Sequence, residues 1–251
     1  MKKEKIQYHI LCKKGDVGNY VLLPGDPARV PIIAAHLDNS KKIAQNREFL
    51  TYTGFYKGIK ISVTSTGVGA PSTSIAVEEL ANIGANTFIR IGTCGAMQNW
   101  LKPGDIIVAT AAVRGDGTTR EYIPEEYPAV ADFNLVYAMK KAADILNIDR
   151  VFFGIIRTHD AFYIESPFAH GDYIARIRHW IDAGVLCVEN ESSAIFVIAS
   201  IRRLRAGSVL VVRGNLVTGE QVRDPEKIRN RMEKAIDLAL KSIELLERGE
   251  V

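Results

Sequence analysis

Residues 60–91, KISVTSTGVGAPSTSIAVEELANIGANTFIRI, decide the fold class of this chain. A β-branched run at Lys60–Ser65 is followed by a glycine-rich turn, a helical stretch at Pro71–Ile83 and a second apolar run at Thr87–Ile91. This strand–helix–strand order is typical of a sheet whose parallel strands are joined by a crossover helix. An apolar run without alternation indicates a strand that is covered on both faces. The stretch therefore predicts an α/β protein.

The same alternation continues along the whole chain. Further strands are expected at Tyr20–Leu23, Leu50–Tyr56, Asp105–Val113, Val151–Arg157, Val185–Val188 and Ser208–Arg213. Further helices are expected at Pro27–Leu37, Phe133–Leu146, Gly171–Ala183, Ser192–Leu204 and Pro225–Arg248. An antiparallel hairpin is expected to turn at Lys57-Gly58. No repeat or linker divides the chain, so we expect a single domain over residues 1–251 with three α/β/α layers, in which helices flank a central mixed, largely parallel sheet.

Composition and charge exclude several classes of protein. No apolar run is long enough to cross a bilayer, and the charged N-terminus lacks the apolar segment of a secretory signal, so we expect a cytoplasmic protein with no membrane partner. The net charge is only +3 and no basic recognition module is present, which argues against nucleic-acid binding. A basic cluster at Arg202, Arg203 and Arg205 is expected to be a solvated helix end. The three cysteines lie far apart, which indicates neither a zinc site nor a disulfide framework.

Two glycine-containing motifs link predicted strands to predicted helices. In Leu23–Arg29, LPGDPAR, Gly25 allows a ligand to approach the backbone and Arg29 offers a fork of donors to an anion. Taken alone, this motif is explained equally well as a plain strand–turn–helix connection. In Ser65–Ser74, STGVGAPSTS, two glycines and several hydroxyls form a plausible cradle for phosphate or sugar oxygens. That motif lacks the third glycine of dinucleotide-binding proteins and the lysine of a P-loop.

A third motif, Arg90–Ala96, ends an apolar strand with the sequence RIGTCGA. Burying the charge of Arg90 would be costly unless the side chain meets an anion or a carboxylate. A structural salt bridge is one explanation. The neighbouring hydroxyl of Thr93 and the position at a strand end, where ligands of α/β folds bind, favour anion binding.

A fourth motif places two carboxylates and an amide, Glu189, Asn190 and Glu191, between a strand and a helix. An ionised carboxylate can accept two hydrogen bonds from a vicinal diol, as in a sugar. The alternative is ordinary helix-start chemistry, because acidic residues stabilise helix N-termini.

Together these motifs resemble the hexameric-type nucleoside phosphorylases, the group that includes uridine phosphorylase, bacterial purine nucleoside phosphorylase and methylthioadenosine phosphorylase. The resemblance covers nearly the whole chain. Its most specific stretches are similar to uridine phosphorylases: Arg47–Phe49 (REF), Ser65–Leu80 (STGVGAPSTSIAVEEL), Phe88–Gln98 (FIRIGTCGAMQ) and Tyr127–Phe133 (YPAVADF).

The resemblance implies roles for individual residues. A phosphate site is implied at Gly25, Arg29, Arg90, Thr93 and, from a neighbouring subunit, Arg47. Ribose binding is implied for Glu189, Asn190, Glu191 and, again from the neighbour, His9. A monovalent cation site between subunits, for K+, is implied at Glu48, Val68 and Ser72. Asn190 departs from the pattern, because the family usually has Met there.

The base site departs further from the family. Phe162 matches an aromatic residue beside base and ribose, but Ser166 and Phe168 stand where uridine phosphorylases place Gln and Arg. Gly214 stands where purine-cleaving relatives place an acidic residue. We hypothesise that Arg213, or alternatively Arg157, stabilises the departing base; the alternative for Arg213 is a surface ion pair, for example with Glu220.

The expected reaction is the phosphate-dependent, reversible cleavage of uridine or a related nucleoside to free base and (deoxy)ribose 1-phosphate. Arg90 and Arg213 are the residues expected to act on the reacting groups. No cofactor is expected, because inorganic phosphate is the co-substrate. Purine nucleoside or methylthioadenosine phosphorylase, a phosphate-independent nucleosidase and a non-catalytic nucleoside-binding protein remain alternatives. Residues shared with a neighbour imply a dimer-based homo-oligomer, a hexamer.

Overall fold

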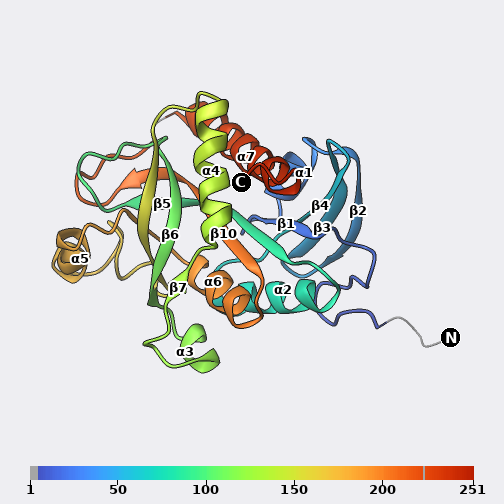
Figure 1. Cartoon of the computed structure of the whole chain (residues 1–251). Helices are drawn as coiled ribbons and strands as arrows, with labels where there is room; N and C mark the ends of the chain where they lie inside the picture. Colours follow the sequence, from blue (N-terminus) through green and yellow to red (C-terminus); the bar gives the residue numbers. More distant parts are fainter. Residues whose placement is uncertain (1–4, 223) are drawn as a thin grey trace.

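A ten-stranded sheet runs through the centre of the molecule, with helices on both sides (Figure 1). The computed structural model describes residues 5–222 and 224–251. Its strands are β1 Tyr20–Leu23, β2 Asp38–Asn46, β3 Phe49–Tyr56, β4 Ile59–Thr64, β5 Thr87–Ala96, β6 Ile106–Gly115, β7 Ala129–Val130, β8 Val151–His159, β9 Cys187–Glu189 and β10 Arg205–Asn215. Its helices are α1 Arg29–Ala34, α2 Ala70–Asn82, α3 Thr118–Tyr122, α4 Phe133–Ile145, α5 Tyr173–Asp182, α6 Ser192–Ile201 and α7 Pro225–Glu247.

Two hydrophobic cores lie on opposite faces of the sheet, which confirms the three-layer α/β/α arrangement. One core contains buried residues of α1, α4 and α7, among them Ile33, Met139 and Ile236. The other contains buried residues of α2 and α6, among them Leu80 and Phe196. Figure 1 shows α4 and α7 on one side of the sheet and α2 and α6 on the other. No helix in the described part of the chain is long and apolar enough to span a membrane.

The sheet closes on itself around β5. This strand pairs in parallel with β1 and β10 and in antiparallel with β9. Strands β10, β6, β8 and β9 follow one another by pairing, so they form a ring that begins and ends at β5. The mixed sheet is confirmed, but parallel pairing prevails only in its central ladders. Antiparallel ladders also join β2–β3, β3–β4, β6–β7 and β6–β10.

Most predicted elements are present, with shifted ends. The hairpin turn at Lys57-Gly58 is confirmed, with both residues at positive φ, 49° and 84°. The helix expected at Pro27–Leu37 is only Arg29–Ala34. Strand β2 was not predicted, because its sequence DNSKKIAQN is polar and it lies at the edge of the sheet, where few side chains are buried.

The topology brings the ends of several strands to one edge of the sheet. Leu23, the last residue of β1, is in register with Arg90 of β5. On the other side of β5, Val211 of β10 is in register with Thr93. The loop that follows β1 therefore starts beside Arg90, and β5 and β10 end beside one another further along the same direction, at Ala96 and Asn215, as expected for a ligand site of an α/β fold.

Candidate active site

A cavity of about 820 Å³ opens at this edge, a volume within the usual range for small-molecule sites. It gathers most of the residues that the sequence singled out: Gly25, Arg29, Glu48, Val68, Arg90, Thr93, Phe162, Ser166, Phe168, Glu189, Asn190, Glu191 and Arg213. Three predicted site residues, His9, Arg47 and Ser72, do not line it.

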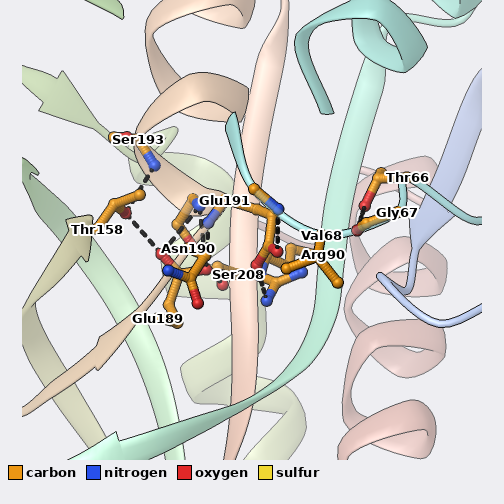
Figure 2. A network of polar contacts seen from close by, with 12 residues as sticks. Thr66, Gly67, Val68, Arg90, Thr158, Glu189, Asn190, Glu191, Ser193 and Ser208 are labelled. Atoms are coloured by element: carbon orange, nitrogen blue, oxygen red, sulfur yellow. Dashed lines mark hydrogen bonds and ion pairs between the residues drawn. The ribbon is translucent and has the colours of Figure 1, made fainter. Parts of the chain in front are cut away.

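Arg90 is the buried cation of the cavity, with 6% of its side chain exposed. Its Nε donates to Glu189 Oε2 at 2.7 Å, and its Nη2 forms an ion pair with Glu191. Figure 2 shows this network. Burial alone would lower the pKa of Arg90, but the carboxylates of Glu191 and Glu189 outweigh it and raise the pKa, so the guanidinium is charged. A Cβ at Gly92 would lie 2.9 Å from Arg90 Cζ, so Gly92 leaves the room that the guanidinium occupies.

The remaining nitrogen of Arg90, Nη1, is buried and has no hydrogen-bond partner among the described residues. A Cβ built on Gly25 would lie 3.9 Å from this Nη1, so the free donor lies beside the loop that follows β1. That loop is tied to the loop after β4, because Gly67 N donates to Gly25 O at 3.0 Å. A buried, charged and unpaired N–H group is costly, and an anion in the cavity would satisfy it.

The two glutamates play different structural roles. Glu189 accepts hydrogen bonds from Arg90, from the Thr158 hydroxyl and from the backbone N–H groups of Glu191 and Ser192. These contacts involve both carboxylate oxygens and hold Arg90 in place, while the role of Glu189 as a ribose ligand stays a prediction. Glu191 accepts a hydrogen bond from Gly69 N at 2.7 Å and forms an ion pair with Arg90. Burial raises the pKa of Glu191, and the charge of Arg90 opposes the rise.

Comparison of the sequence with known protein families identifies the family to which this cavity belongs. The family profile described as "Phosphorylase superfamily" matches residues 19–246. The chain belongs to the Phosphorylase superfamily. A uridine phosphorylase of Thermococcus kodakarensis is 48% identical over 90% of this chain and 83% of its own length. A guanosine phosphorylase of Halorubrum lacusprofundi is 40% identical over 96% of this chain and 99% of its own length.

A solved structure supports the assignment. The crystal structure of uridine phosphorylase from Vibrio fischeri matches with a TM-score of 0.87 at 35% identity, covering 96% of this chain and 98% of the other. The protein is therefore an enzyme, a nucleoside phosphorylase, which transfers a pentosyl group from a base to phosphate.

Two further arginines of this phosphorylase face the cavity. Burial lowers the pKa of Arg29, and the nearby charges of Arg90 and Arg213 lower it further, against the opposing effect of Asp26. The guanidinium of Arg29 is thus close enough to those of Arg90 and Arg213 to be repelled by them, although carboxylates such as Asp26 and Glu191 also line the cavity. An anion beside these arginines would relieve that repulsion. Arg213 is exposed, lines the cavity and forms no ion pair within the described residues, so the proposed surface pair with Glu220 is absent.

Arg157, the alternative candidate for stabilising the departing base, pairs with Glu165 and packs on Trp180. Its Nη2 and Nε donate to Glu165 Oε1 and Oε2 at 2.8 and 3.0 Å, and its Cζ lies 4.7 Å from the ring centre of Trp180. It does not line the cavity. The cavity residue that Arg157 contacts is Glu165, and the hypothesis that Arg157 stabilises the departing base stays a prediction.

The residues expected from a neighbouring subunit of the phosphorylase lie outside its own cavity. His9 Nδ1 lies 2.7 Å from Glu79 Oε1, and Arg47 is an exposed turn residue with φ of 50°. Asn190 faces the cavity, and its Nδ2 donates to the backbone oxygen of His159. That contact joins the segment Glu189–Glu191 to the end of β8.

Two cavity residues, His159 and Glu165, were not predicted as site residues. Burial lowers the pKa of His159, with Glu165 opposing and Arg157 adding to the decrease. Burial would raise the pKa of Glu165, but the hydrogen bonds and charge of Arg157 outweigh it, so the pKa is lowered. The position of His159 two residues after the predicted strand Val151–Arg157 was the one sequence signal that could have identified it.

Proposed function

We propose that this enzyme is a uridine phosphorylase, which cleaves uridine with inorganic phosphate to uracil and ribose 1-phosphate. The observation that carries the proposal is the buried Arg90, whose free Nη1 lies beside Gly25 in a cavity that Arg29 and Arg213 also line. An anion site built from Arg29, Arg90 and, from a neighbouring subunit, Arg47 would serve no purpose in a hydrolase that uses water. Uridine is favoured because the Thermococcus and Vibrio relatives carry that name, at 48% and 35% identity.

In this proposal Gly25, Arg29, Arg90 and Thr93 hold the phosphate. The glycosidic bond breaks through a cationic, oxocarbenium-like sugar, so phosphate must lie directly below the reacting carbon. Holding the two reactants together replaces a bimolecular encounter, and the phosphate charge stabilises the developing sugar cation. No covalent enzyme intermediate is required. Arg213, at the open side of the cavity, would stabilise the base as it leaves with negative charge.

Glu191 would bind the ribose hydroxyls. Its carboxylate is held by Gly69 N and by Arg90, yet each oxygen retains lone pairs for a diol. Because Arg90 also carries the free Nη1, one guanidinium would connect the sugar-binding and phosphate-binding groups. Asn190, also at the cavity, replaces an apolar sugar contact by an amide.

We further propose that Arg47 and His9 complete the site of a neighbouring subunit, in a dimer-based hexamer. Neither lines its own cavity, as this arrangement requires. We propose the implied K+ site at Glu48, Val68 and Ser72 as part of the same assembly. It is supported by the approach of two of its side chains to one glycine, since a Cβ at Gly67 would lie 2.8 Å from Glu48 Cγ and 3.1 Å from Ser72 Oγ. Light scattering at assay concentrations tests the proposed hexamer; an active monomer would contradict it.

The cytoplasmic location of the protein stays a prediction.

The decisive experiment measures base release with and without phosphate for uridine, thymidine, inosine, guanosine, adenosine and methylthioadenosine. The proposal expects phosphate-dependent release, fastest from uridine. A preference for guanosine is the second candidate, favoured by the 40% identical Halorubrum relative. Release without phosphate would indicate a nucleosidase, and no release from any nucleoside would indicate a binding protein.

A further inference from the structure

One wall of the cavity contains none of the residues that we propose to bind phosphate or ribose. It is formed by the end of β8 and by the chain that follows, and it contains His159, Phe162, Glu165 and Phe168. Phe162 and Phe168 are exposed by 51% and 67%, whereas His159 and Glu165 keep only 7% and 11% of their side chains exposed. The wall thus offers aromatic faces at its rim and two buried polar groups behind them.

The two polar groups belong to a chain of contacts that starts away from the cavity. Arg157 lies over the Trp180 ring, 4.7 Å from its centre, and donates to both oxygens of Glu165. Gly115 makes this placement possible, because a Cβ there would lie 2.2 Å from Arg157 Nη1. A bidentate guanidinium fixes the plane of a carboxylate as well as its charge. Glu165 is therefore an ionised group held in one orientation.

Glu165 in turn faces His159. The distance from Glu165 Oε2 to His159 Nδ1 is 3.6 Å, and Asn190 fixes the backbone of His159 by donating to its oxygen. The charged groups around the imidazole are Glu165, Arg157, Glu189 and Asp160. Burial lowers the pKa of His159, so the ring is neutral at pH 7. An anionic oxygen beside Nδ1 favours the proton on that nitrogen, which leaves Nε2 as a hydrogen-bond acceptor.

We propose that His159 recognises the nucleobase, its Nε2 accepting a hydrogen bond from a ring N–H of the base, and that Glu165 is the positioning residue that sets the imidazole tautomer. This inference rests on the proposed function. Uracil and the 6-oxopurines carry such an N–H beside a carbonyl. Adenine presents a bare ring nitrogen instead, which would repel the Nε2 lone pair. The pocket therefore takes oxo-bases of either ring size.

The test is a double-mutant cycle between the imidazole and the base N–H. Glutamine can place its amide oxygen where Nε2 stands, whereas the shorter asparagine reaches only the position of Nδ1. We expect His159→Gln to keep most of kcat/KM for uridine and His159→Asn to lose about 10- to 100-fold, the value of one buried hydrogen bond. Wild-type enzyme should prefer uridine over N3-methyluridine, and His159→Asn should lose that preference. His36→Asn, whose imidazole pairs with Glu233 outside the cavity, is the matched control and should behave as wild type.

The positioning role of Glu165 has its own readout. Protonation of His159 removes the Nε2 acceptor, so kcat/KM for uridine at saturating phosphate should fall at acidic pH. Glu165 raises the pKa of His159, so in Glu165→Gln this acid limb should move to lower pH. A merely structural defect would lower the rate without moving the limb.

Three outcomes would overturn the inference while leaving phosphorolysis intact. These are equal activity of His159→Gln and His159→Asn, an unchanged preference for uridine over N3-methyluridine in His159→Asn, and an unmoved acid limb in Glu165→Gln. Failure of the proposed function looks different, because it shows in the wild-type enzyme: base would be released without phosphate, released faster from another nucleoside than from uridine, or not released at all.

Discussion

Replacing Arg90 by lysine should separate the two tasks of its guanidinium. Lysine keeps the charge but offers one nitrogen in place of a planar fork of three. It can stay near the buried carboxylates of Glu189 and Glu191, but it cannot also supply the donor that Nη1 presents beside Gly25. Loss of one charge-assisted hydrogen bond to phosphate is worth about 1.5–3 kcal/mol. At about 1.4 kcal/mol per factor of ten, kcat/KM for phosphate should fall about 10- to 150-fold.

The assay follows the absorbance change from uridine to uracil while phosphate is varied, and urea unfolding confirms that the variant is folded. Arg202→Lys is the matched control, because Arg202 is a partly buried arginine paired with Glu78 away from the cavity. Its kcat/KM should not change. A folded Arg90→Lys enzyme with wild-type kcat/KM for phosphate would refute the role of Nη1.

Three more predictions test other parts of the structure. Thr158→Val removes the hydroxyl that donates to buried Glu189, so the free energy of unfolding should fall by about 1–3 kcal/mol in urea titrations; no change would mean that the contact is dispensable. Arg47→Ala and Arg90→Lys chains coexpressed in equal amounts should recover about a quarter of wild-type activity, because half of randomly paired dimers are mixed and each of these has one intact site. A specific activity equal to the mean of the two separate variants would argue against shared sites. Arg157 holds the pKa of Glu165 below its ordinary 4.5, so this pair stabilises the fold above that pH and the contribution is lost as pH falls through the lowered pKa; the acid dependence of unfolding should weaken in Arg157→Gln.

The sequence predicted the order of the elements because core strands and helices carry strong hydrophobic patterns. The central strands are continuous apolar runs, and α7 begins at Pro225 with Asp224 as its N-cap, as the pattern indicates. It could not predict β2, whose polar residues face solvent at the edge of the sheet. It also could not predict the closure around β5, because pairing of β5 with β10 joins segments more than a hundred residues apart and leaves no local pattern.

The site was predictable where strand ends carry unusual residues. The sequence allowed two explanations for Arg90, a salt bridge and an anion site. The structure shows the salt bridges with Glu189 and Glu191 and a free nitrogen besides, so one side chain accommodates both explanations. The difference between Glu189 and Glu191 was not predictable, since it depends on which carboxylate faces Thr158 across two strands. The contact of Glu165 with Arg157 depends likewise on how the chain folds back after β8.

The attachment of β5 to three neighbouring strands affects how this enzyme can evolve. Arg90 and Thr93 stand on that strand, where any displacement would disturb several ladders at once. The cavity wall that we propose to face the base belongs largely to residues 160–172 instead, the connection between β8 and α5. Substitutions there can exchange one leaving group for another while the machinery that joins phosphate to sugar is inherited unaltered. A single ancestral scaffold could in this way give rise to enzymes that salvage different nucleosides.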